Sequence, residues 1–188
     1  LGLSLVSAYS KDGRESLASR VNQQYVYPYA RVLIYSCNKY EATRHEVIRH
    51  SWLKDLAKYD IDYAFVVGDA QQPHMQADKM CLNVRDTYEE LPQKSLTMFE
   101  FAAENSHHRY YYKIDDDCVL NVDAMFGDPA FLGSDYFGRM VTRSIGGVDR
   151  SWHHLKSSTI EAKESLDLSP EMSAYCDGST GYILSRQA

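Results

Sequence analysis

The sequence predicts an α/β domain with a mainly parallel central sheet that is flanked by helices. Runs of apolar and β-branched residues alternate along the chain with segments that have a helical period. These runs are not interrupted by polar residues, which is typical of parallel strands buried on both faces. With 188 residues, 44% of them hydrophobic, the chain is expected to form one domain with its own core.

The first predicted strand follows an extension at the amino terminus, residues 1–30, which has no clear period. The run RVLIYSCN, residues 31–38, is long enough for a buried strand. Thr43 and Glu46 then match a T-x-x-E capping box, which predicts a helix beginning there. Apolar residues then recur every fourth position, at Ile48, Trp52 and Leu56, which predicts one helix face packed in the core. Trp52 is therefore expected to be a core residue.

The middle of the chain predicts two further strands and a second helix. DYAFVVGD, residues 62–69, is a buried run that ends near a glycine. A loop with the sequence QQPH, within residues 70–80, and a short strand, MCLNV at 80–84, are expected next. The second helix is predicted from Leu91 to Asn105. Its apolar face consists of Leu96, Phe99 and Ala103.

The last part of the chain predicts three strands, RYYYKI (109–114), DYFGRMV (135–141) and GYILS (181–185). The stretch between the last two, residues 142–173, is polar and is expected to form loops that select the acceptor of any reaction. Directly after the first of these strands come three consecutive carboxylates, Asp115, Asp116 and Asp117.

This acidic triplet is the candidate site, because ligands bind beyond the carboxyl ends of parallel strands. Side chains alternate along an extended chain, so Asp115 and Asp117 are predicted on one side and Asp116 on the other. Neighbouring carboxylates repel, and a divalent cation removes that cost while it binds the phosphate oxygens of a substrate. A solvated turn after the strand explains the same residues equally well.

Two classes of enzyme use such a motif. DDDCVL matches D-x-D-x-[TV]-[LVI], the first motif of haloacid dehalogenase-like phosphohydrolases, in which Asp115 would be the nucleophile and Asp117 the general acid. The triplet also matches the D-x-D motif of nucleotide-sugar glycosyltransferases. An EF-hand is excluded, since Leu120 stands where that loop needs glycine.

Further segments, in the same order, resemble the family 31 glycosyltransferases, the β-1,3-galactosyltransferase and Fringe group. In the segment DTYEELPQKS, Glu90 replaces the asparagine that is usual in the family, and in the segment YCDGSTGYILS, Ser179 replaces a glycine. The resemblance extends over about residues 31–185. The segments are RHEVIRHSW (44–52), FVVGD (65–69), DTYEELPQKS (86–95), YYYKIDDDCVLNVDAM (110–125) and YCDGSTGYILS (175–185).

The resemblance implies a GT-A-like nucleotide-sugar-binding fold in residues 31–188, truncated at its carboxyl end. It implies inverting transfer of a hexose or N-acetylhexosamine (Gal, GlcNAc or GalNAc) from a UDP-sugar to a glycan hydroxyl, with a β-1,3 linkage. Mn²⁺ or Mg²⁺ would be bound by Asp117 and Asp115. The catalytic base is expected beyond Ala188, with Asp177 as a weaker candidate. The implied donor-binding residues are Arg44, Arg49, Lys94, Asp115, Asp116, Gly178 and Gly181.

Lys94 and the two arginines, Arg44 and Arg49, could bind the diphosphate or carboxylates that hold the site together. The two glycines would let the backbone approach a sugar closely. A module of the same fold that binds a sugar nucleotide without transferring the sugar is a further alternative.

Composition limits the classes of molecule that the protein is expected to bind. A net charge of −6 disfavours binding to nucleic acid or to an anionic membrane surface. The apolar run LGLSLVSA, residues 1–8, is too short to span a bilayer, so membrane association is expected only through segments outside this chain. The four cysteines form no CxxC pair and are expected to be buried thiols. The family implies the Golgi lumen for a eukaryotic protein, as a type II membrane protein, and the cytoplasm or inner membrane for a bacterial one.

Overall fold

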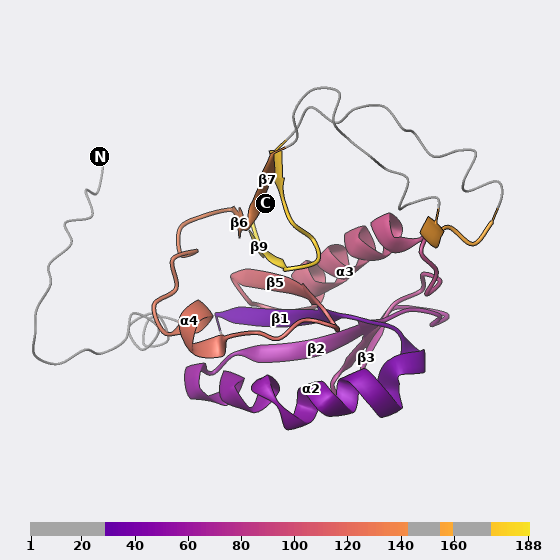
Figure 1. The fold of residues 1–188 in the computed structure, drawn as a ribbon, viewed down its shortest axis with the longest axis horizontal. Coiled ribbons are helices and arrows are strands. Elements are labelled where there is room, and N and C mark those ends of the chain that lie inside the picture. The colour runs from indigo at the N-terminus through magenta and orange to yellow at the C-terminus, as the bar shows by residue number, and fades with distance from the viewer. Residues whose placement is uncertain (1–28, 143–154, 160–173) are drawn as a thin grey trace, which may run out of the picture.

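The computed structural model describes residues 29–142, 155–159 and 174–188. The predicted extension, residues 1–30, and the polar stretch, residues 142–173, lie almost wholly outside these ranges. In the described part, helices cover both faces of a mixed seven-stranded sheet (Figure 1). The predicted α/β class is therefore confirmed.

The sheet has a parallel centre and antiparallel edges, in the order β3-β4-β2-β1-β5-β9-β6. Its parallel strands are β4 (Lys79–Cys81), β2 (Asp62–Val67), β1 (Ala30–Tyr35) and β5 (Tyr110–Asp115). The antiparallel strands are β3 (His74–Gln76), β9 (Tyr182–Ser185) and β6 (Tyr136–Gly138). A separate antiparallel pair is formed by β7 (Met140–Thr142) and β8 (Ala174–Cys176). The prediction of parallel strands thus holds for the centre of the sheet.

Two strand predictions were wrong in detail. The loop expected at residues 70–80 contains β3, which forms a hairpin with β4. The strand expected at 135–141 divides at Arg139 into β6 and β7, which belong to different sheets. Neither change is visible in the apolar pattern, because edge strands of three residues are too short to show a period.

The first helical segment is irregular and begins earlier than predicted. It consists of η1 (Asn38–Tyr40), the π-turn η2 (Glu41–His45), α2 (Glu46–His50) and the 3₁₀ segment η3 (Trp52–Tyr59). Thr43 therefore lies inside the segment, where its hydroxyl donates to the carbonyl of Tyr40 at 3.3 Å. The predicted capping box is wrong, because Glu46 pairs with Arg49 instead of with the start of a helix. The predicted core face is confirmed, since Ile48, Trp52 and Leu56 are all buried.

The second long helix, α3 (Leu91–Asn105), has the predicted bounds, but its buried face differs. Leu96 is 54% exposed, whereas the predicted Phe99 and Ala103 are partly buried against the core, and Met98 and Ala102 are fully buried. Lys94 completes this buried face, because residues four apart lie on one side of a helix. The helix is thus rotated so that a lysine points inward. A short helix, α4 (Val122–Phe126), follows the acidic triplet.

Core packing accounts for the layers. Val32 and Ile34 of β1 belong to the cluster that includes Trp52 and η3. Leu33 and Tyr35 belong to the cluster on the α3 side of the sheet. β1 is therefore buried on both faces, as its uninterrupted apolar run predicts.

The prediction that the four cysteines are buried thiols is confirmed for two of them. All four cysteines are free thiols, of which Cys81 and Cys176 are buried and Cys37 and Cys118 partly buried. In the ranges that the structure describes, no helix has the length and apolarity needed to cross a bilayer.

The strand register brings the chain segments of the site together. Tyr35 and Asp115, the last residues of β1 and β5, are directly paired. β9 runs antiparallel to β5, with Tyr182 opposite Lys113. The turn that precedes β9 therefore lies beside the carboxyl end of β5, next to the acidic triplet.

Gly181 makes this close approach possible. Its φ is +92°, and a Cβ there would lie 2.6 Å from the carbonyl oxygen of Lys113 and 2.7 Å from the ring of Tyr112. Gly178, in the same turn, has no such constraint, since the nearest atom to its Cβ position is Lys113 Nζ at 3.9 Å.

We predict that Gly181→Ala lowers the free energy of unfolding by more than about 2 kcal/mol, through backbone strain and contact with β5. The matched change Gly178→Ala should alter it by less than about 0.5 kcal/mol. Urea denaturation followed by circular dichroism measures both. Equal losses would show that the turn does not depend on the close approach of Gly181 to β5.

Candidate functional site

The candidate site lies where β1 and β5 end, and the three aspartates face different surroundings there. Asp115 is the last residue of β5, and Asp116 and Asp117 form a turn. The backbone N–H of Asp116 still donates to the carbonyl of Tyr35 at 3.2 Å. The alternation predicted from an extended chain therefore stops at Asp115 and does not describe the two residues after it.

Asp116 is the buried member of the triplet. Its Oδ1 accepts from the guanidinium of Arg44, and its Oδ2 accepts from the hydroxyl of Ser36 at 2.5 Å. Ser36 Oγ lies 2.7 Å from Nε2 of His45, a fully buried side chain. Burial lowers the pKa of His45, although the nearby Glu41 opposes this shift. Both oxygens of Asp116 are thus used inside the protein.

Sequence reasoning did not single out Ser36 or His45. Ser36 directly follows the apolar run of β1, and a small polar residue at the end of a buried strand is the signal that could have found it. His45 has no comparable signal, because its place inside the fold depends on the π-turn.

Asp115 is turned toward β9. Nζ of Lys113 pairs with Asp115 Oδ1 and donates to the carbonyl of Gly178 at 2.7 Å. The same ammonium lies 4.7 Å from the ring centroid of Tyr35. Burial raises the pKa of Asp115, although the ammonium of Lys113 counteracts the shift. Lys113 therefore joins the first aspartate to the turn before β9 that contains Gly178 and Gly181, here called the glycine-rich turn.

Asp117 is the exposed member of the triplet, with 63% of its side chain accessible. Its Oδ2 lies 3.9 Å from Nη1 of Arg44, the same nitrogen that binds Asp116. In the described ranges, no three His, Cys, Asp or Glu side chains come together as a metal cage. The exposed carboxylate nevertheless fits Mn²⁺ or Mg²⁺, which take one or two carboxylates together with substrate phosphate oxygens.

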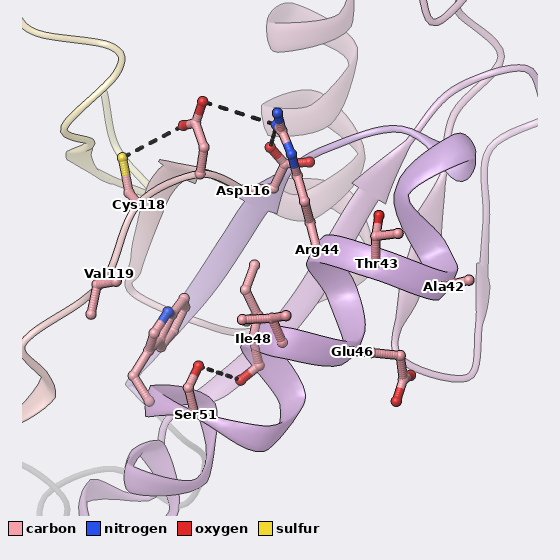
Figure 2. Close-up of a pocket in the computed structure, with 12 residues that line it drawn as sticks. Ala42, Thr43, Arg44, Glu46, Ile48, Ser51, Asp116, Cys118 and Val119 are labelled. Carbon is pink, nitrogen blue, oxygen red and sulfur yellow. Dashed lines mark hydrogen bonds and ion pairs between the residues drawn. The ribbon is translucent and has the colours of Figure 1, made fainter.

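A pocket of about 590 Å³ opens on the α2 side of the triplet. Figure 2 shows Arg44 reaching from the helical segment toward Asp116, with Cys118 and Val119 on the facing loop. Val119 is 85% exposed at the rim, and Trp52 is buried, as predicted for a core residue. The lining residues are Ala42, Thr43, Arg44, Glu46, Val47, Ile48, Ser51, Trp52, Asp116, Asp117, Cys118 and Val119.

Lys94 supports the site from the α3 side. Its side chain is 2% exposed, and Nζ lies 2.5 Å from both Asp86 Oδ1 and the carbonyl oxygen of Ser36. Asp86 Oδ1 also accepts from the backbone N–H of Gly68 at 2.9 Å. Of the two roles that the sequence allowed for Lys94, the structure shows the one in which it holds carboxylates.

Arg49 has a similar role away from the triplet. It makes two hydrogen bonds to Asp78, at 2.8 and 3.1 Å, and further contacts with Glu41 and Glu46. These carboxylates join the helical segment to the β3–β4 hairpin. Contact of Arg49 or Lys94 with a donor stays a prediction.

The glycine-rich turn is closed by Asp177. Its Oδ1 accepts from the backbone N–H and the hydroxyl of Ser179, at 3.1 and 2.8 Å. Burial raises the pKa of Asp177, but the hydrogen bonds from Ser179 and Thr180 and the charge of Arg139 together lower it below its ordinary value. A lowered pKa weakens a general base, so this geometry gives the carboxylate a role in the turn.

Comparison with known proteins adds independent findings. A family model described as Galactosyltransferase matches residues 43–188. A curated human relative, UDP-GalNAc:beta-1,3-N-acetylgalactosaminyltransferase 2, is 26% identical over 114 residues. The match covers 58% of this chain and 20% of the relative, so the chain spans about a fifth of that protein's length. The family match includes the triplet, the helical segment from Thr43 and the glycine-rich turn.

We predict that Lys94→Met destabilises the fold by about 3 kcal/mol or more, because it leaves the carboxylate of Asp86 buried without its cation. Arg85→Met is the matched control, since Arg85 is 75% exposed and pairs with Glu90 at 2.7 Å. It should leave the free energy of unfolding near that of the wild type. Urea denaturation measures both. A loss for Lys94→Met no larger than that of the control would contradict a structural role for the buried pair.

Proposed function

The chain belongs to the galactosyltransferase family, and from this premise we propose that it binds the donor in a metal-dependent, inverting glycosyltransferase. The donor is a UDP-linked hexose or N-acetylhexosamine, and the acceptor is a glycan hydroxyl, with a β-1,3 linkage. The observation that carries the proposal is the exposed carboxylate of Asp117 beside Arg44, at the carboxyl ends of β1 and β5. Sheets of this kind bind ligands at that edge.

The fold supports the same proposal. A parallel centre with helices on both faces is compatible with a GT-A-like nucleotide-sugar fold. The printed name of the human relative gives UDP-GalNAc as its donor and β-1,3 as its linkage. UDP-GalNAc is therefore the first donor to screen, followed by UDP-GlcNAc and UDP-Gal.

Residues of this chain have distinct tasks in the proposed reaction. Arg44, 39% exposed, presents a cation to the diphosphate while it holds Asp116 and Asp117 together. Asp117, with Asp115 beside it, would bind Mn²⁺ or Mg²⁺. Such an ion offsets the negative charge that develops on the departing diphosphate. The backbone of Gly178 lies next to Asp115 through Lys113 and can approach the donor sugar closely.

Two alternatives predict different results. A haloacid dehalogenase-like phosphohydrolase rests on six residues of the triplet segment, whereas the family match covers residues 43–188. It predicts hydrolysis of a generic phosphomonoester that Asp115→Asn abolishes. An inactive sugar-nucleotide module predicts donor binding without transfer.

We predict that UDP binds the purified chain in a Mn²⁺-dependent manner and that Asp117→Asn weakens this binding by at least about tenfold, because a ligand to the cation is lost. Isothermal titration calorimetry with and without Mn²⁺ measures the effect. Asp123→Asn is the matched control, since it removes the same charge at a similar exposure, 64% against 63% for Asp117.

The control should bind UDP like the wild type. If UDP does not bind under any metal condition while a phosphomonoester is hydrolysed, the glycosyltransferase proposal is wrong. Equal effects of both substitutions would remove Asp117 from the cation site.

A further inference from the structure

Two residues that are adjacent in the sequence hold the buried aspartate of the triplet. Arg44 binds Asp116 Oδ1 directly, and His45 reaches Asp116 Oδ2 through the hydroxyl of Ser36. Successive side chains of an α-helix point about 100° apart, so two neighbours do not normally serve one carboxylate. Here both residues lie in the π-turn η2, and Ser36 bridges the distance between His45 and the carboxylate. Single π-turns occur frequently at functional sites.

The hydrogen bonds of this group run in one direction. Ser36 has a single hydroxyl proton, and it donates that proton to Asp116 at 2.5 Å. Ser36 Oγ must therefore accept from His45 at 2.7 Å, so Nε2 of His45 carries the hydrogen. The imidazole stacks on Phe65 with 4.2 Å between ring centroids and is fully buried, which fixes its orientation.

Asp117 depends on this group for its position. It follows β5 in a turn, it is exposed, and its two side-chain contacts are long, at 3.9 Å from Arg44 Nη1 and 3.9 Å from Sγ of Cys118. The neighbouring Asp116, in contrast, is held from both oxygens and from its backbone N–H. The position of the exposed carboxylate is thus set mainly by the buried one beside it.

We propose that His45 is a positioning residue for the donor site, which acts through Ser36 and Asp116 to place Asp117 and Arg44 for a nucleotide diphosphate and its divalent cation. This inference rests on the proposed function. Residues that orient the ligands of a metal typically change metal affinity by about 10- to 100-fold when they are replaced. His45 lies further from the cation site than such residues do, because two hydrogen bonds and the Asp116–Asp117 peptide bond separate it from Asp117, so we expect an effect at the lower end of this range.

The test uses two substitutions of His45 with different hydrogen-bonding capacity. His45→Gln keeps an N–H donor at a similar distance from the backbone, and His45→Met fills the site without a donor. UDP affinity is measured by calorimetry with and without Mn²⁺, and thermal unfolding of each variant is followed without ligand. We expect His45→Met to reduce the Mn²⁺-dependent gain in UDP affinity by about tenfold and His45→Gln to restore most of it.

His108→Met is the matched control. His108 is also a buried histidine, and its Nε2 lies 3.0 Å from Asp62, at the start of β2. Because β1, β2 and β5 are parallel, the start of β2 lies at the sheet edge opposite the triplet. This variant should lower the unfolding temperature but leave the Mn²⁺-dependent gain unchanged.

The outcomes separate this inference from the proposed function. If the wild type shows Mn²⁺-dependent UDP binding and His45→Met retains the full gain at temperatures where it is folded, the positioning role is overturned and the function stands. If His108→Met loses the gain as well, the effect is one of stability and the positioning role is again overturned. Absence of Mn²⁺-dependent UDP binding by the wild type overturns both.

Discussion

Ser36 is the point at which the two sides of the molecule are joined. Its carbonyl oxygen accepts from Lys94, which comes from α3 on one face of the sheet. Its hydroxyl connects His45, from the helical segment on the other face, with Asp116 at the end of β5. Buried charges and polar groups are tolerated only with partners, so each of these residues depends on the others. Core packing sets the two helical layers, and this junction connects them at the carboxyl ends of β1 and β5.

The same junction explains how the chain accommodates three consecutive carboxylates. Lys113 balances Asp115, and Arg44 balances Asp116, so two of the three charges have an internal cation. The charge of Asp117 is turned to solvent, since 63% of its side chain is exposed. The repulsion expected for a stack of like charges is thus reduced by neighbours from two different elements and, at Asp117, by solvent.

The sequence predicted those features that local pattern determines. Uninterrupted apolar runs located β1, β2 and β5, and the bounds of α3 were also correct. The buried face of α3 was wrong at Leu96 and did not include Lys94, whose pairing with Asp86 is a contact made between elements. The partners of the triplet could be predicted only in part. The family motifs predicted Arg44 as a site residue. The burial of His45 could not be predicted, because no local sequence pattern indicates the π-turn in which it lies.

The glycine-rich turn lies beside Asp115 because of the strand order in the sheet, more than because of any single motif. Because β9 is antiparallel to β5, the residues before Tyr182 meet the carboxyl end of β5 and bring Gly178 to Lys113. Lys113 also pairs with Asp115, so a displacement of the glycine-rich turn would change the contacts of the first aspartate. The two sides of the site are therefore coupled through one buried lysine. The requirement for glycine at position 181 belongs to that coupling, since a side chain there would push the turn away from β5.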